Sequence, residues 1–75
     1  MVNILGNEYK LNDVICVGYK NDRGNYEIIS GRIYLWNNLY VHLDCSYDFQ
    51  QLEDTVRVKI DNVKYVKKTM ENYWR

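Results

Sequence analysis

Residues 33–49 read IYLWNNLYVHLDCSYDF, and this stretch decides the predicted fold. Apolar and polar residues alternate on both sides of two adjacent asparagines, which is typical of two half-buried strands joined by a tight turn. We predict a three-residue connection over 36–38, with Asn38 in the left-handed conformation that asparagine tolerates. The stretch therefore indicates a β-hairpin.

The register of this hairpin follows from sorting its apolar residues to one face. The three-residue connection pairs Leu35 with Leu39, Ile33 with Val41 and Gly31 with Leu43. The other face then carries Tyr34 beside Tyr40, Arg32 beside His42 and Ser30 beside Asp44. A two-residue turn over 37–38 would instead pair Ile33 with His42 and mix apolar with polar groups on both faces. We therefore expect the three-residue register.

Two more hairpins are predicted nearer the N-terminus. VNIL and EYKL flank a predicted turn at Gly6-Asn7, which places Ile4 opposite Tyr9. A longer hairpin is expected over 14–36, where the polar loop NDRGN separates two apolar runs and Gly24 takes the left-handed position.

The later part of the chain supplies the remaining strands. Gly31 interrupts an apolar run and is predicted to bend its strand. TVRVKI and VKYVKK are predicted to be the last two strands, and Thr69 is expected to cap a short C-terminal helical turn. Five to seven short antiparallel strands in one small domain, spanning 1–75, predict an all-β barrel.

This predicted order resembles the small barrels of the Src-homology-3-like and Sm-like classes. The resemblance covers residues 8–68 and rests on YKLNDVICV entering the barrel, SGRI at the bend and VRVKIDNVKYV closing it. It implies a fold and no function, because neither the acidic-aromatic ligand loop of peptide-binding barrels nor an RNA-contact motif of the Sm class is evident.

Composition limits the classes of protein that the chain could be. Seventy-five residues make one domain with a thin core, and ten acidic residues balance ten basic ones. Two cysteines are too few for a secreted disulfide scaffold, and the N-terminus MVNILGNEYK lacks the pattern of a signal peptide. No apolar run approaches the roughly 18–20 residues that span a bilayer. We therefore expect a cytoplasmic protein without a membrane segment.

His42, Asp44, Cys45 and Ser46 are the residues most suggestive of catalysis. A nucleophile and its base must lie within hydrogen-bond distance of each other, but strand alternation points His42 and Asp44 outward and Cys45 inward. A structural zinc site needs four ligands, and His42, Cys45 and Cys16 offer too few at an unusual spacing. Phosphate-binding glycine loops are absent from the sequence. We expect no enzymatic activity, no metal and no cofactor.

Exposed aromatic residues without catalytic partners favour a protein-interaction module, and this is our first hypothesis. One form of it is an accessory or inhibitory protein of a phage or plasmid that binds a host protein. A homodimer is also expected, because small sheets expose unpaired edges. The predicted partner-binding residues are Arg32, Tyr34, Trp36, Tyr40 and His42.

Single-stranded nucleic acid is the alternative partner. Residues 55–75 hold six basic and two acidic residues, a net charge of +4, whereas residues 1–54 hold four and eight, a net charge of −4. Basic residues beside exposed tyrosines are typical of single-strand binders, although lysines on edge strands also prevent aggregation. The residues predicted for this role are Arg57, Lys59, Lys64, Lys67 and Lys68.

Overall fold

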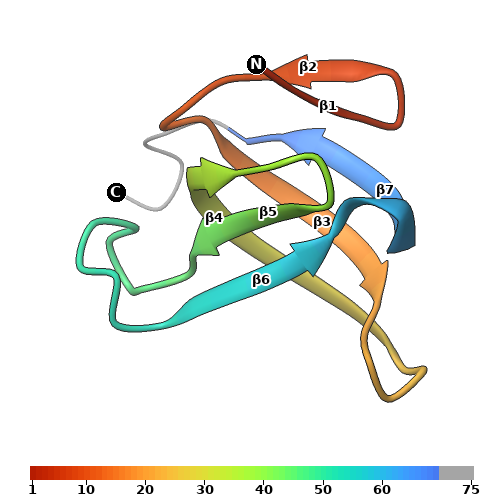
Figure 1. The fold of residues 1–75 in the computed structure, drawn as a ribbon. Coiled ribbons are helices and arrows are strands. Elements are labelled where there is room, and N and C mark those ends of the chain that lie inside the picture. Colours follow the sequence, from red (N-terminus) through yellow and green to blue (C-terminus); the bar gives the residue numbers. More distant parts are fainter. Residues whose placement is uncertain (70–75) are drawn as a thin grey trace.

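Strands make up almost all of the regular structure in the computed structural model, which describes residues 1–69 (Figure 1). Between the last two strands lies a single turn of 3-10 helix, η1 (Ile60–Asn62). The strands are β1 (Val2–Ile4), β2 (Asn7–Tyr9), β3 (Val14–Lys20), β4 (Tyr26–Trp36), β5 (Tyr40–Asp44), β6 (Thr55–Lys59) and β7 (Val63–Lys68). The predicted all-β class is confirmed. The predicted C-terminal helical turn falls on residues 70–75, outside the described part of the chain.

Five strands form one antiparallel sheet in the order β6-β5-β4-β3-β7, and β1 pairs with β2 in a separate hairpin. The long strand β4 belongs to both halves of the sheet. It pairs with β3 from Tyr26 to Arg32 and with β5 from Arg32 to Trp36. The change of partner comes one residue after Gly31, where a bend was predicted.

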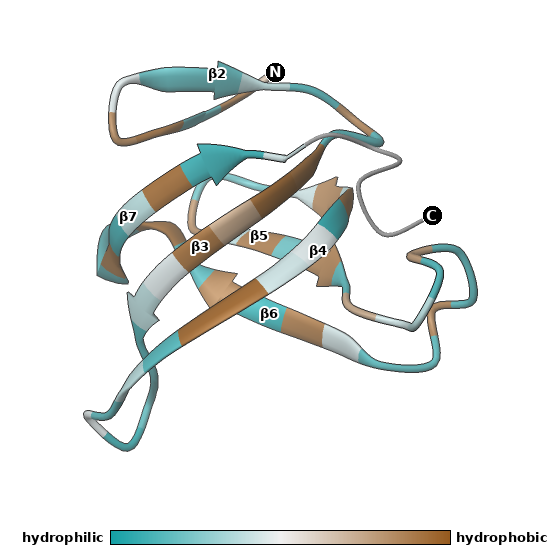
Figure 2. Ribbon diagram, turned by 180° about the vertical axis from the view of Figure 1, so that it is seen from behind, coloured by the Kyte–Doolittle hydropathy of each residue, from teal (hydrophilic) through white to brown (hydrophobic). Residues whose placement is uncertain are grey.

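The core joins the five-stranded sheet to the N-terminal hairpin. Along β3, Ile15, Val17 and Tyr19 face inward and are almost completely buried. Figure 2 shows hydrophobic residues along the central strands, and hydrophilic ones alternating with them on β6 and β7. The other buried core residues are Val2, Ile4, Tyr9, Ile33, Val41, Leu43, Val58 and Val63. Because Val2, Ile4 and Tyr9 belong to this cluster, the β1–β2 hairpin packs on the sheet.

The predicted turn of the first hairpin is wrong by one residue. Val2 pairs with Tyr9 and Ile4 with Asn7, so the turn consists of Leu5 and Gly6. Both turn residues have positive φ angles, 52° and 81°, as a primed two-residue hairpin turn requires. This register buries the inward side chains and leaves Leu5 54% exposed. The gain in burial outweighs the strain of a left-handed leucine.

Neither register considered for the 33–49 hairpin is correct. Trp36 pairs with Val41 and Leu35 with His42, because the turn begins after Asn37, whose N–H donates to the carbonyl of Tyr40. A β-bulge at Tyr34 then adds one residue to β4, so that Ile33 pairs with Leu43. Arg32 consequently pairs with Asp44, and not with His42.

Asn37, and not the predicted Asn38, organises the turn of this hairpin. The side-chain oxygen of Asn37 accepts hydrogen bonds from the backbone N–H groups of Leu39 and Tyr40, both at 2.8 Å. Asn38 is not among the described residues with positive φ. An Asx-type turn therefore replaces the predicted left-handed asparagine.

Candidate interaction surface

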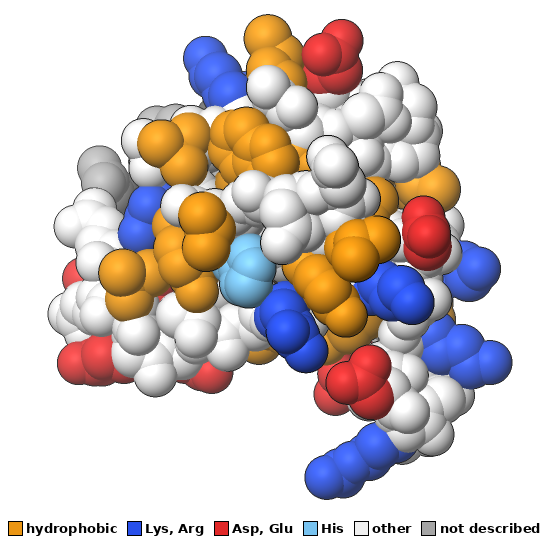
Figure 3. Space-filling model, in the orientation of Figure 1, with side chains coloured by type: hydrophobic (Ala, Val, Ile, Leu, Met, Phe, Trp, Pro, Cys, Tyr) orange, Lys and Arg blue, Asp and Glu red, His pale blue; other side chains and the backbone are white. Residues whose placement is uncertain are grey.

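The outer face of β4, β5 and β6 carries most of the predicted partner-binding residues. Cross-strand pairing places Leu35, His42 and Arg57 in one row across the three strands, and Tyr40 beside Lys59 in the next row. We call these five residues the β5 face. Leu35 is 54% exposed, Arg57 and Lys59 are exposed, and Tyr40 and His42 are half-buried. Figure 3 shows His42 in pale blue, with basic and hydrophobic side chains around it.

Two ring contacts order the side chains of this face. The guanidinium carbon of Arg57 lies 4.3 Å from the centre of the Tyr40 ring, a cation–π contact. The ring of Tyr34 lies 6.0 Å from that of His42 and is tilted by 59°. The bulge thus brings Tyr34 to His42, whereas the sequence predicted that it would lie beside Tyr40.

A pocket of about 130 Å³ lies at the end of the β5 face. It combines three cations with one carboxylate, Asp22, so its lining has a net charge of +2. Its lining residues are Tyr19, Lys20, Asn21, Asp22, Tyr40, Arg57, Lys59 and Asn62.

Tyr19 forms one wall of this pocket and is fixed by a hydrogen bond. Its hydroxyl donates to Oε2 of Glu27 at 2.9 Å. Burial, and then the hydrogen bond and negative charge of Glu27, raise the pKa of Tyr19 to about 12. Glu27 therefore accepts from a neutral phenol and fixes its orientation in the pocket wall.

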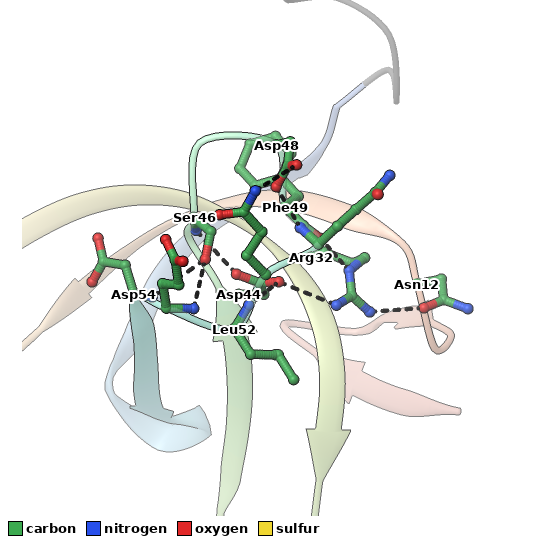
Figure 4. Close-up of polar contacts among 11 residues, drawn as sticks. Asn12, Arg32, Asp44, Ser46, Asp48, Phe49, Leu52 and Asp54 are labelled. Atoms are coloured by element: carbon green, nitrogen blue, oxygen red, sulfur yellow. Dashed lines mark hydrogen bonds and ion pairs between the residues drawn. The ribbon is translucent and has the colours of Figure 1, made fainter.

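Two predicted partner-binding residues serve the fold instead. Trp36 is half-buried and packs against the core. The guanidinium of Arg32 donates to Oδ2 of Asp44 at 3.1 Å, to Oδ1 of Asn12 at 3.0 Å and to the carbonyl of Phe49 (Figure 4). Each of the three nitrogens of Arg32 thus donates within the protein, so Arg32 belongs to the framework of the 45–54 loop.

The residues predicted for nucleic-acid binding are divided between two parts of the molecule. Arg57 and Lys59 lie on β6 and line the pocket. Lys64, Lys67 and Lys68 lie on β7, at the opposite edge of the sheet order. The ammonium of Lys68 lies 3.4 Å from Oδ1 of Asp13. The five cations therefore do not form one row.

Of the residues most suggestive of catalysis, His42 and Cys45 are held apart, and Ser46 and Asp44 are bonded to each other. His42 contacts Tyr34 on the outer face, whereas Cys45 packs against the core. Burial, followed by the charges of Asp54 and Asp44, raises the pKa of Cys45 to about 11, which keeps the thiol protonated. The Ser46 hydroxyl accepts the backbone N–H groups of Glu53 and Asp54. Each group serves a structural contact.

A second exposed patch was missed in the sequence. Gly18 pairs with Ile28 on β4 and with Tyr65 on β7, and the Tyr26 ring lies across the space where a Gly18 side chain would be. The exposed fractions of Tyr26, Ile28 and Tyr65 are 54%, 65% and 44%. We call these three residues the Gly18 patch. Alternation of Tyr26 and Ile28 hinted at it, but the place of Tyr65 depends on the pairing of β7 with β3.

Possible metal ligands, helices and comparisons with known proteins assign no function to the described part of the chain. Among residues 1–69, no three His, Cys, Asp or Glu side chains are grouped so that they could hold a metal ion. That range also contains no helix of the length and hydropathy needed to cross a membrane. No family model, curated protein or solved structure matches the chain.

Proposed function

We propose that this protein is a non-enzymatic protein-interaction module that binds its partner through the β5 face. The observation that carries the proposal is the row of Leu35, His42 and Arg57 across three strands, in which Leu35 is exposed and Arg57 stacks on Tyr40 of the next row. Arginine and tyrosine are enriched among residues that dominate binding energy, and an apolar neighbour supplies area removed from water.

Order within this face supports the proposal. An arginine that already rests on a tyrosine ring loses less side-chain freedom when a partner binds, so less of the binding energy is spent on ordering it. The strands beneath keep these side chains at fixed spacings.

A small barrel of the Src-homology-3-like type is the finer fold that we propose for this module. The support is the order of strands: β7, the last of them, pairs with β3, and η1 alone separates it from β6 at the other edge. A cytoplasmic accessory protein of a phage or plasmid, acting on a host protein, is the biological setting in which we place it as a hypothesis.

Single-stranded nucleic acid is the second candidate. The observation in its favour is that Lys20, Arg57 and Lys59 line one pocket with the Tyr40 ring, since single-strand sites combine cations with stacking rings. Against it, Lys64, Lys67 and Lys68 do not line that pocket, and Lys68 is paired with Asp13. The protein partner therefore stays the first choice.

Affinity capture from nuclease-treated lysate of the source cells tests the proposed function. The immobilised wild-type chain should retain a defined protein, and Leu35→Ala or Tyr40→Ala should each weaken its retention about tenfold, for a loss of about 1.4 kcal/mol. Tyr47→Ala is the matched control, because Tyr47 is 93% exposed on the 45–54 loop, away from the β5 face. Equal retention by all variants contradicts the proposal, and loss of all captured material on nuclease treatment favours nucleic acid.

A further inference from the structure

The pocket at the end of the β5 face concentrates positive charge in a chain of zero net charge. Lys20 comes from the end of β3, whereas Arg57 and Lys59 come from β6, so elements far apart in the sequence supply the three cations. Like charges held close together repel one another, and an anion in the pocket would relieve that repulsion. This is an arrangement that a carboxylate can complete.

Neutral groups of the lining suit the same ligand. The side-chain amides of Asn21 and Asn62 offer further N–H donors, and Arg57 is already oriented by its contact with Tyr40. A cavity of roughly 10–15 Å³ holds one water molecule, so a pocket of about 130 Å³ admits a side chain. Asp22 is the one carboxylate of the lining, and its negative charge disfavours a second anion on its side of the pocket.

We propose that this pocket binds the side-chain carboxylate of an acidic segment of the protein partner, an inference that rests on the proposed function. Charge complementarity decides the occupant. A nucleic-acid strand carries a phosphate at every nucleotide, whereas only three cations line this pocket and the β7 lysines are not among them. A single Asp or Glu side chain, with apolar neighbours that contact Leu35, matches both the pocket and the β5 face.

Selection from a random peptide library displayed on phage tests this inference. The wild-type chain should enrich peptides with an acidic residue at a common position. The double variant Arg57→Glu, Lys59→Glu should instead enrich peptides with Lys or Arg there, because its lining has the opposite charge. The matched control Lys64→Glu, Lys67→Glu makes the same change of charge on β7 and should select the same acidic peptides as wild type. Replacing the selected acidic residue by its amide in a synthetic peptide should weaken binding at least tenfold.

Failure of the inference is distinguishable from failure of the proposed function. Enriched peptides without acidic residues, or identical peptides selected by wild type and by the Arg57→Glu, Lys59→Glu variant, overturn the acidic-partner inference and leave a protein-binding face. Absence of any enriched peptide also overturns the acidic-partner inference, whereas salt-sensitive binding of oligothymidylate in place of peptides overturns both. Amide spectra of each variant establish that it is folded before selection, and Lys59→Gln supplies a milder change if the double variant is not.

Discussion

The guanidinium of Arg32 lies 3.1 Å from the carboxylate of Asp44, whose side chain is completely buried. The same carboxylate accepts the backbone N–H groups of Ser46 at 3.0 Å and Leu52 at 3.2 Å. One buried charge thus joins β4, the end of β5 and both arms of the 45–54 loop, as Figure 4 shows. A buried carboxylate is tolerated because each of its oxygens has a donor.

Substitution Asp44→Asn should destabilise the protein by about 3 kcal/mol. The amide removes the negative charge opposite Arg32 and turns an N–H donor toward groups that themselves donate. Asp48→Asn is the matched control in the same loop: Asp48 is half-buried and accepts bonds from Gln50 and Gln51, so its loss should cost less than about 1 kcal/mol. Urea unfolding of the three proteins measures both values, and equal stabilities of the two variants would contradict the role of Asp44.

Acid should remove the contribution of Asp44 to stability. Burial opposes its ionisation, but hydrogen bonds from Ser46, Leu52 and Arg32 outweigh burial and lower the pKa of Asp44 below 3.8. The unfolded chain therefore binds a proton more readily than the folded one, so the contribution is complete above about pH 4 and is lost as pH falls through the folded value. The stability difference between wild type and Asp44→Asn should shrink below about pH 4. A difference that is constant from neutral to strongly acidic pH would contradict this.

Local pattern was sufficient to predict strands and turns where one residue type has a clear preference. Alternation of Val56 and Val58 with charged residues predicted β6, and Gly24 has the predicted left-handed conformation, with φ of 83°. The turn at Leu5 and Gly6 was missed because a left-handed leucine is rare, and only the burial of the flanking strands favours it. Burial of Val2, Ile4 and Tyr9 in the core, and not local preference, therefore determines the place of this turn.

The candidate site was predicted in part for the same reason. Alternation correctly put Tyr40 and His42 on the outer face. The turn after Asn37 pairs Trp36 with Val41 and so directs Trp36 to the core, and the bulge at Tyr34 then pairs Arg32 with Asp44. Alternation of apolar and polar residues specifies neither the place of the turn nor the bulge. The pocket lined by Lys20, Arg57 and Lys59 and the Gly18 patch also depend on how strands far apart in the sequence pair, which periodicity does not specify.

Alanine substitutions at two strand glycines should have opposite outcomes. A Cβ at Gly31 would lie 2.9 Å from both Sγ of Cys45 and Cβ of Leu43, and 3.0 Å from the backbone oxygen of Asp44, so the strand must move. Gly31→Ala should cost about 1–3 kcal/mol. A Cβ at Gly18 would instead meet the exposed Tyr26 ring, which is free to turn away, so Gly18→Ala should change stability by less than about 0.5 kcal/mol. Thermal unfolding of both variants checks the contrast, and a Gly18→Ala loss as large as that of Gly31→Ala would refute it.

Alkaline titration should identify Tyr19. Its pKa is raised from 10.0 to about 12, first by burial and then by Glu27. The folded chain therefore holds the Tyr19 proton more tightly than the unfolded chain does, and this difference contributes to stability. The contribution is complete below pH 10 and is lost as pH rises toward 12. Rapid mixing into alkaline buffer records the phenolate absorbance of wild type and of Tyr19→Phe. The difference between the two proteins is the signal of Tyr19, and it should develop near pH 12. Glu27→Gln should move it to lower pH. A Tyr19 signal that develops near pH 10 would contradict the contact.

The Gly18 patch and the β7 edge beside it should make the chain self-associate. Tyr26 and Ile28 on β4 and Tyr65 on β7 expose large apolar surfaces on the two strands that flank β3. Because β7 ends the sheet order, a second copy can cover these side chains and pair backbone at once. Sedimentation across the micromolar range should show a dimer in wild type. Ile28→Lys should shift the equilibrium toward monomer, because a charge in the middle of a dimer contact must be desolvated. Leu11→Lys is the control, since Leu11 is 49% exposed but lies in the turn before β3. A wild-type monomer throughout this range would remove the prediction, and equal dissociation by both lysine variants would move the contact away from the Gly18 patch.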